Sequence, residues 1–206
     1  ACPAGSYNQF VSSSLPPPLA TLCGETKPEF SCSQLPTRGV YRRTQDCTLG
    51  DEVDVSGDLS VIGQENTYTT LFAAAGQRHF KITSGAHRLG LKWLNVTGGD
   101  VSGNSNPDNR GGSIYVHLVA SQLNISYCIF VNNVAVYGGA IYLNGATFHG
   151  KWNEFKMNTA QQHGGAMRIY ACSMVSITGD TYTKNTALKG GAIAIHGSSS
   201  NPSQLD

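Results

Sequence analysis

The sequence predicts an all-β fold, a right-handed parallel β-helix (solenoid) with an N-terminal disulfide-rich segment. Gly-Gly-Ala or Gly-Gly-Ser motifs recur at spacings of 27, 26 and 26 residues, and an aromatic-x-x-Asn motif precedes three of the four. A fixed period of this size is typical of a solenoid. The unit is shorter than the roughly 30 residues of a strand-helix-strand crossover, so we expect three short strands per coil. The glycine pairs are Gly111-Gly112, Gly138-Gly139, Gly164-Gly165 and Gly190-Gly191.

The first segment, residues 1–50, is rich in Cys, Pro and Ser. It has few periodic apolar positions, so it requires covalent staples, and two disulfides are expected from its four cysteines. The spacing leaves all three connectivities open, and the lack of a Cys-x2-Cys pair disfavours a zinc site. A start at Ala1 without an apolar leader fits a secreted chain whose signal peptide has been removed. The four cysteines are Cys2, Cys23, Cys32 and Cys47.

The β-helix is expected over residues 51–206, with clear repeats at 111–195. Short apolar stretches between 53 and 96, separated by Gly, Asp, Asn and Ser, indicate degenerate coils. About six coils at a strand spacing of roughly 4.8 Å make a rod near 30 Å long. Residues 98–110 have no apolar period and are expected to leave the solenoid as a loop, either a tolerated insertion or a binding loop.

Within the clear repeats, apolar residues alternate at period two and predict buried faces. One inward strand follows each glycine pair, a second precedes each aromatic anchor, and the anchor starts the third. The glycines are expected to permit close stacking or positive φ at one corner, and the asparagines to form a ladder at another. The anchors are Phe130, Phe155 and Tyr182, and the ladder is Asn133, Asn158 and Asn185.

These paired motifs, Gly-Gly-Ala-Ile with Phe-x-x-Asn, resemble the repeat of the chlamydial polymorphic outer membrane proteins. The resemblance covers about residues 111–195, and related repeats are similar to those of secreted β-helix proteins of algae and other protists. It implies a right-handed β-helix displayed outside the cell and used for adhesion or surface structure.

Two further features of the repeats bear on secretion. Cys128 and Cys172 stand alone, and we expect a bridge between coils, with buried thiols as the alternative. The sequons at Asn95 and Asn124 lie between inward apolar positions, so both side chains are expected to face solvent, and we expect an N-linked glycan on at least one.

Composition and charge exclude several classes of function. Charged residues make up 13% of the chain and the formal net charge is +1, so no nucleic-acid partner is expected. No apolar stretch approaches the roughly 18 residues that span a membrane as a helix. The histidines are scattered, and neither a metal nor another cofactor is expected.

Catalysis is also not expected. Enzymes built on β-helices need acids clustered on outward positions of successive coils, whereas the outward positions of the Gly-Gly strands carry none. Asp100, Asp108 and Arg110 in the loop are the remaining candidates, and solvated turn formers are the simpler interpretation. The outward Tyr115 and Tyr142 fit either cross-strand aromatic pairing, which we favour, or a sugar-binding or protein-contact stripe.

The last Gly-Gly strand, with Ile193 and Ile195, is followed only by a polar tail, so we expect an open end that exposes apolar rows. Head-to-tail stacking through such an end makes a filament. The sequence therefore predicts a secreted structural glycoprotein of an extracellular filament, hair or wall layer, with itself or other extracellular structural proteins as partners. A cell-surface adhesin or glycan-binding β-helix is the alternative, and a carbohydrate-active lyase or hydrolase comes third.

Overall fold

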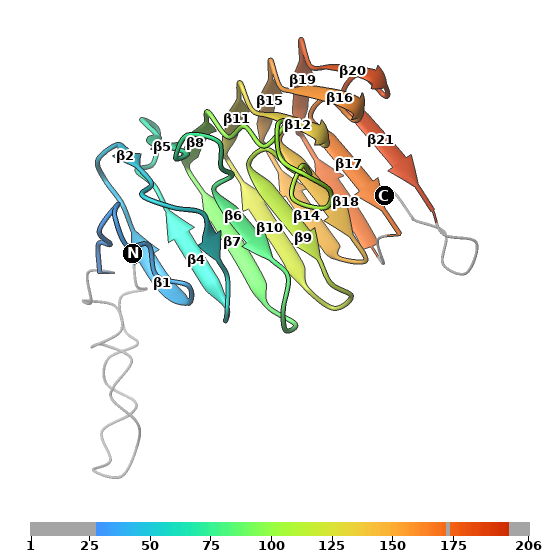
Figure 1. Cartoon of the computed structure of the whole chain (residues 1–206). Helices are drawn as coiled ribbons and strands as arrows, with labels where there is room; N and C mark the ends of the chain where they lie inside the picture. The colour runs from blue at the N-terminus through green and yellow to red at the C-terminus, as the bar shows by residue number, and fades with distance from the viewer. Residues whose placement is uncertain (1–27, 172–173, 198–206) are drawn as a thin grey trace, which may run out of the picture.

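The computed structural model describes residues 28–171 and 174–197, and all the regular structure in them is β. Figure 1 shows the strands stacked side by side along one axis, from β1 near the described N-terminal end to β21 near the described C-terminal end. The strands form four parallel sheets. The predicted parallel β-solenoid is confirmed.

Three of the sheets contain six strands. Sheet 1 stacks β1 (Gly39–Arg42), β4 (Leu59–Ile62), β7 (Arg88–Lys92), β10 (Gln122–Ser126), β14 (Thr147–Lys151) and β18 (Met174–Thr178). Sheet 2 stacks β2 (Cys47–Thr48), β5 (Thr69–Phe72), β8 (Leu94–Thr97), β11 (Ile129–Val131), β15 (Glu154–Lys156) and β19 (Thr181–Thr183). Sheet 4 stacks β3 (Val53–Asp54), β6 (Phe80–Ile82), β9 (Ile114–His117), β13 (Ile141–Asn144), β17 (Met167–Tyr170) and β21 (Ile193–His196).

A fourth strand in each later coil was not expected from the sequence. Sheet 3 contains β12 (Val134–Tyr137), β16 (Thr159–His163) and β20 (Thr186–Lys189). Its inward row consists of alanines, with Ala135 and Ala160 buried and Ala187 half-buried. Alanine adds little to a hydrophobic pattern, which is why the alternation did not reveal this strand.

The core is built from rows of like residues, because in-register parallel pairing places equivalent residues of successive coils above one another. The anchors of sheet 2 show this most clearly: the rings of Phe130 and Phe155 stack at 5.0 Å and 9°, and those of Phe155 and Tyr182 at 5.0 Å and 4°. Phe148 lies between Leu123 and Val175 in the inward row of sheet 1. The predicted inward positions are confirmed.

The Gly-Gly corner requires glycine for two reasons. The first glycine of each pair has positive φ, for example 63° at Gly138. In the first three pairs the second glycine has no room for a side chain; a Cβ at Gly139, for example, would lie 2.1 Å from the carbonyl oxygen of Gly165 in the next coil. Both structural roles expected for these glycines are therefore present.

The asparagine ladder forms at the corner between sheets 2 and 3. The backbone N and the Nδ2 of Asn133 both donate to Oδ1 of Asn158. The backbone N and the Nδ2 of Asn158 donate in the same way to Oδ1 of Asn185. Asparagine tolerates left-handed backbone angles, which is a further reason to expect it at a turn, but the ladder residues do not adopt them. The preceding residues do so instead, with φ of 55°, 54° and 55° at Asn132, Met157 and Lys184.

The solenoid begins before residue 51, the boundary that the composition suggested. Strands β1 and β2 already pair with β4 and β5, so part of the Cys-rich segment belongs to the first coil. Phe30 is buried at this end, in a T-shaped contact with Tyr41 at 6.4 Å. Residues 28–37 therefore cover the core beside β1, and we call them the N-terminal cap.

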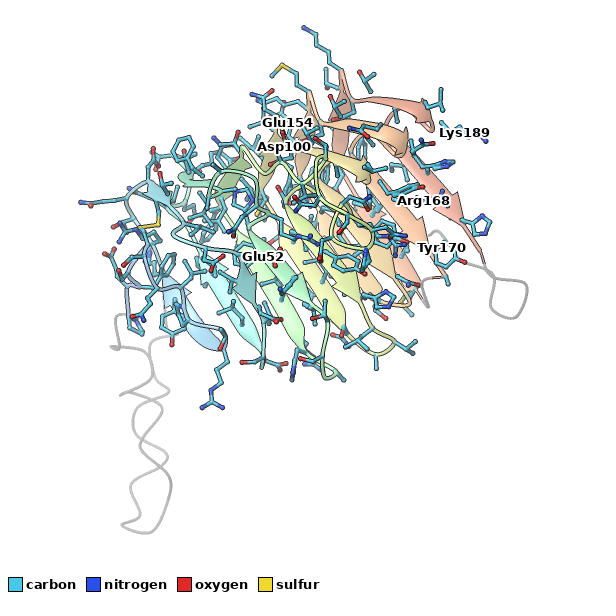
Figure 2. The ribbon with its side chains drawn as sticks, viewed as in Figure 1. Glu52, Asp100, Glu154, Arg168, Tyr170 and Lys189 are labelled. Atoms are coloured by element: carbon cyan, nitrogen blue, oxygen red, sulfur yellow. A yellow bond between two sulfur atoms is a disulfide. The ribbon has the colours of Figure 1, made fainter. Side chains whose placement is uncertain are left out.

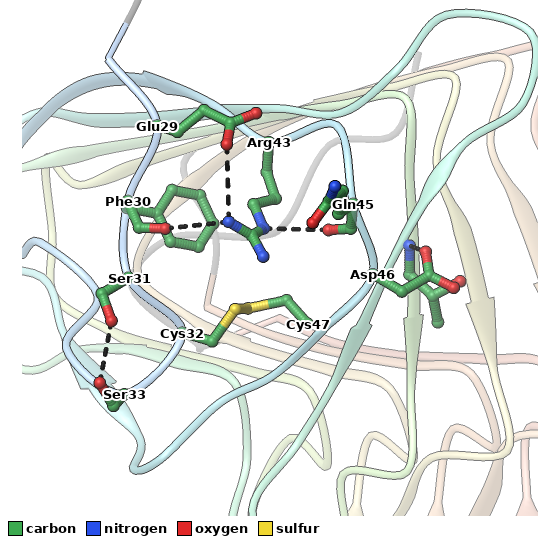
Figure 3. Close-up of a disulfide and its surroundings, with 10 residues drawn as sticks. Glu29, Phe30, Ser31, Cys32, Ser33, Arg43, Gln45, Asp46 and Cys47 are labelled. Carbon is green, nitrogen blue, oxygen red and sulfur yellow. Dashed lines mark hydrogen bonds and ion pairs between the residues drawn. A yellow bond between two sulfur atoms is a disulfide. The ribbon is translucent and has the colours of Figure 1, made fainter.

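A disulfide joins this cap to the first coil. Cys32 and Cys47 are bonded, with Cα atoms 5.7 Å apart, and Figure 3 shows the bridge beside Phe30 and Arg43. Cys2 and Cys23 lie outside the described residues. Cys128 is a buried free thiol, so the expected bridge to Cys172, itself outside the described residues, is not formed. Burial raises the pKa of the Cys128 thiol to about 12, which makes it chemically inert.

Candidate functional site

The outward positions around the Gly-Gly corner form the most distinctive surface of the described solenoid. Three columns run along the axis, one from the residue before each glycine pair and two from the outward positions of sheet 4. We call this surface the Gly-Gly face. Its columns are Arg110, Tyr137, His163 and Lys189; Tyr115, Tyr142, Arg168 and Ala194; and His117, Asn144, Tyr170 and His196.

The loop at residues 98–110 covers the first half of the Gly-Gly face. It forms no described strand, as expected, and only isolated bridges tie Asp100 and Arg110 to β12. The guanidinium of Arg110 lies over the ring of Tyr142, 5.1 Å from its centroid. Tyr115 and Tyr142 are 3% and 6% exposed, so these two rings do not form an accessible sugar-binding stripe. Their centroids are 5.7 Å apart, which fits the cross-strand pairing favoured from the sequence.

The second half of the face is open. Lys189 and His196 are exposed, while His163, Arg168 and Tyr170 are half-buried. Figure 2 shows Arg168 and Tyr170 projecting from β17 on the same side as Lys189 at the end of β20. The rings of Tyr170 and His196 stack at 5.0 Å and 7°, which orders them along the axis.

The electrostatic character of this open half is positive. Partial burial lowers the pKa of His163, and the nearby charges of Arg168, Lys189 and His196 lower it further. All three neighbouring groups are cations or become cations, so they repel a proton on His163. The open half therefore presents hydrogen-bond donors and positive charge, and the three columns contain no carboxylate.

A polar pocket of ≈ 430 Å³ lies between the loop and the first coils. Its buried charged residue is Arg78, whose Nε lies 2.5 Å from Glu52. The Nη1 and Nη2 of Arg78 donate to the carbonyl oxygens of Arg110 and Asp108. Burial lowers the pKa of Arg78, while the carboxylates of Glu52 and Asp108 oppose that shift. Lys81 also contacts Glu52, at 2.7 Å. This cluster pins the loop to the solenoid, and residue periodicity offered no signal for it.

The loop residues considered for catalysis have structural partners. Asp100 accepts hydrogen bonds from the backbone N and the Oγ of Ser102, which is a turn-forming arrangement. Asp108 is 67% exposed and lies 3.9 Å from Arg78. Arg110 donates to Asn106 and covers Tyr142. The described contacts thus give these residues the role of organising the loop.

The two sequon asparagines lie on separate sheets. Asn124 is on β10, half-buried, and pairs in register with Gly90, whose lack of a side chain leaves a shallow pocket of ≈ 250 Å³ beside it. Asn95 is on β8, and its Oδ1 is buried without a hydrogen-bond partner. Asn124 is therefore the more accessible of the two positions.

The described C-terminal end of the solenoid presents open strand edges. The strands β18, β19, β20 and β21 are each the last in their sheet among the described residues. Ile195 is 44% exposed and Ile193 is half-buried, although both continue rows that are fully buried one coil earlier, at Ile169 and Met167. This end retains the pairing groups and apolar rows of a coil interface.

The described residues contain no cluster of three or more metal-ligating side chains, and they form no helix that is long and apolar enough to cross a membrane. No curated protein matches the chain. No solved structure matches it either. Residues 127–144, which run from the corner before β11 through β13, match the Chlamydia polymorphic membrane protein (Chlamydia_PMP) repeat. The chain is therefore a parallel β-solenoid that carries a Chlamydia polymorphic membrane protein repeat, and its Cys32–Cys47 disulfide indicates an extracytoplasmic location.

Proposed function

We propose that this protein is a structural subunit of an extracellular filament, hair or wall layer, without a catalytic role. Its coils assemble by strand pairing through the end formed by β18 to β21. The observation that carries the proposal is the set of four strand edges at this end that no described strand covers, with Ile195 exposed and Ile193 half-buried beside them. Parallel strands that lack a neighbour leave unpaired N–H and C=O groups, which a second solenoid can satisfy in register.

The two described ends differ, which bears on how assembly proceeds. At the other end the cap buries Phe30. Two carbonyl oxygens of the cap accept backbone hydrogen bonds from the first coil: Pro28 O accepts from Arg42 N, and Cys32 O accepts from Gly50 N. Head-to-tail growth places β18 to β21 of one copy against β1 to β3 of the next, beside this cap. Repeated head-to-tail contacts do not close and so make a filament, whereas pairing of two open ends stops at a dimer.

Electron microscopy of the purified protein under mild salt tests the proposal. We expect ordered filaments from the unmodified chain and none after Ile193→Lys with Ile195→Lys, because the two ammonium groups would be buried in each new interface. Phe72→Lys with Val119→Lys is the matched control, since both residues are exposed apolar positions away from this end. Monomers at all concentrations, or dimers only, would overturn the filament.

The structural subunit is further proposed to be a glycoprotein, with Asn124 as the occupied sequon. The support is the space beside Gly90 and the outward position of Asn124 on β10. Peptide mapping by mass spectrometry, after expression in a secretory eukaryotic host, is expected to find glycan at Asn124 and less at Asn95. An unoccupied Asn124 would contradict this part of the proposal.

A further inference from the structure

We infer that the open half of the Gly-Gly face binds an acidic polysaccharide. The residues that carry this inference are those of the open half together with the half-buried Tyr137, which pairs with Arg110 at the edge of the covering loop: Tyr137, His163, Arg168, Tyr170, Lys189 and His196. They come from sequence positions far apart and meet only because successive coils stack in register. The inference does not rest on filament assembly: Lys189 and His196 belong to β20 and β21, whose edges form the proposed interface, but the binding surface is formed by the outward side chains.

The first argument is uncompensated charge. Among the described residues the ion pairs involve Arg43, Arg78, Lys81 and Lys156, and neither Arg168 nor Lys189 takes part in one. The formal charge of the whole chain is only +1, so the positive potential here is local. A surface that gathers cations without partners is complementary to an anionic ligand.

The second argument is the fixed orientation of the polar rings. Tyr137 and His163 stack at 5.7 Å and 9°, and Tyr170 and His196 at 5.0 Å and 7°. Stacking holds the rings side by side along the axis, so little conformational freedom is lost when a ligand binds. Phenol and imidazole groups can donate hydrogen bonds, and carboxylate, sulfate and hydroxyl oxygens are the acceptors that match them.

The third argument is periodicity along the axis. Equivalent residues of successive coils lie about 4.8 Å apart, so side chains with a hydrogen-bond donor recur at that interval, from Tyr137 to His163 to Lys189 and from Tyr170 to His196. An extended polysaccharide repeats its sugar rings at a similar interval, and each ring of an acidic polymer can present an anionic group and hydroxyls. The covering loop at residues 98–110 blocks the face as far as Tyr142 of β13, which leaves β17 and β21 for the ligand.

The extracytoplasmic location of the protein favours a polysaccharide over a nucleic acid as the ligand. The Cys32–Cys47 disulfide belongs to an oxidising environment outside the cytoplasm, where acidic glycans are the abundant linear polyanions. A nucleic acid would satisfy the charge but not this location, and it therefore serves as an arm of the test.

Isothermal titration calorimetry with four probes tests the inference: alginate oligomers, dextran sulfate, neutral dextran and single-stranded DNA. We expect binding of alginate, dextran sulfate or both, weakened as salt rises from about 20 to about 150 mM, because surface charge contacts are screened. The alginate and dextran sulfate arms distinguish carboxylate from sulfate recognition. No binding to either, equal binding of neutral dextran, or DNA binding as tight as that of the acidic glycans would overturn the inference.

Variants with matched charge assign the binding to this face. Arg168→Ser with Lys189→Ser is expected to raise the Kd for the bound glycan about tenfold. Arg88→Ser with Lys151→Ser removes one arginine and one lysine from sheet 1, both exposed, and is expected to change the Kd less than about twofold. Equal losses in the two double variants would show binding through net charge alone and would overturn the site.

Tyr170→Phe provides a second readout that keeps the stacked ring and removes only the hydroxyl. We expect about a threefold loss of affinity, since one hydrogen bond to the ligand disappears. Unchanged affinity in this variant, together with unchanged affinity in the Arg168 and Lys189 variant, would place any binding elsewhere on the molecule.

Discussion

Single buried polar side chains satisfy the backbone at the corners of this fold. Nδ2 of Asn158 donates to the carbonyl oxygen of Phe130 as well as to Asn185, and Asn158 is fully buried. A second ladder, unrecognised in the sequence, links Cys128 N to Asn153 Oδ1 and Asn153 to Asp180 Oδ1. Each of these side chains satisfies backbone groups that water cannot reach. Its removal leaves those groups unpaired, so the loss of stability exceeds the net contribution of the hydrogen bonds to folding.

Protonation of His79 makes the stability of the fold depend on pH. The His79 side chain is fully buried, and its Nε2 lies 3.0 Å from the carbonyl oxygen of Leu71. Burial lowers the pKa of His79 from 6.5 to about 4. A lowered pKa in the folded state means that protons favour the unfolded chain. The contribution of neutral His79 to the free energy of unfolding is therefore fully present above about pH 6.5. It is lost progressively as the pH falls towards 4, by roughly 3 kcal/mol in total.

Urea unfolding at pH 7 and pH 5 measures this effect. We expect the free energy of unfolding to fall by about 2 kcal/mol between these pH values through His79. In His79→Gln that part of the dependence disappears, while His149→Gln, at an exposed position on β14, retains it. An unchanged pH dependence in His79→Gln would contradict the assignment.

At the scale of elements, the strands are short and the corners decide how closely coils approach. The three strands of sheet 3 form because two consecutive glycines let β12, β16 and β20 turn directly into sheet 4. The loop at 98–110 occupies the corresponding place one coil earlier, where it pairs only through Asp100 and Arg110. The loop and the strands of sheet 3 thus occupy equivalent positions in successive coils.

Gly139→Ala tests the corner. Its new Cβ would meet the carbonyl oxygen of Gly165 at 2.1 Å and the backbone of Thr159 at 2.7 Å, so the coils must separate. We expect a loss of at least about 3 kcal/mol, measured by thermal unfolding. Gly103→Ala is the control, because a Cβ there meets nothing within 4 Å. Equal melting temperatures for the two variants would refute the close-stacking argument.

At the scale of the molecule, each coil contacts mainly its neighbours, so stability is distributed along one dimension. The cap and its disulfide protect one described end, whereas the other presents open edges. Local opening is therefore expected to start at the ends and to spread inward.

Removal of the disulfide probes this one-dimensional behaviour. Cys32→Ala with Cys47→Ala opens a loop of 15 residues, for which the chain-entropy contribution is about 3 kcal/mol. Hydrogen exchange is expected to lose protection in β1 and β2 first, while β13 and β14 stay protected. A uniform loss of protection would show instead that the solenoid unfolds as one cooperative unit.

The sequence by itself determined the fold class, the period, the inward rows and the two structural corners. These features depend on local periodicity and on residues, such as glycine, whose geometry is special wherever they occur. It also placed the loop at 98–110, because an interrupted apolar pattern is visible without any partner. The alanine row of sheet 3 and the early start of the solenoid were missed, since short or weakly apolar strands carry little signal.

Only the tertiary structure decided which outward residues are accessible and which meet. Tyr115 and Tyr142 look exposed by alternation but are covered by Arg78 and Arg110, which come from other coils. Arg168, Tyr170 and Lys189 became one surface only through the register of the stacked coils. The pairing of Cys32 with Cys47 was likewise open in the sequence. Such contacts join residues distant in the chain, and their geometry depends on how coils stack, which periodicity alone does not specify.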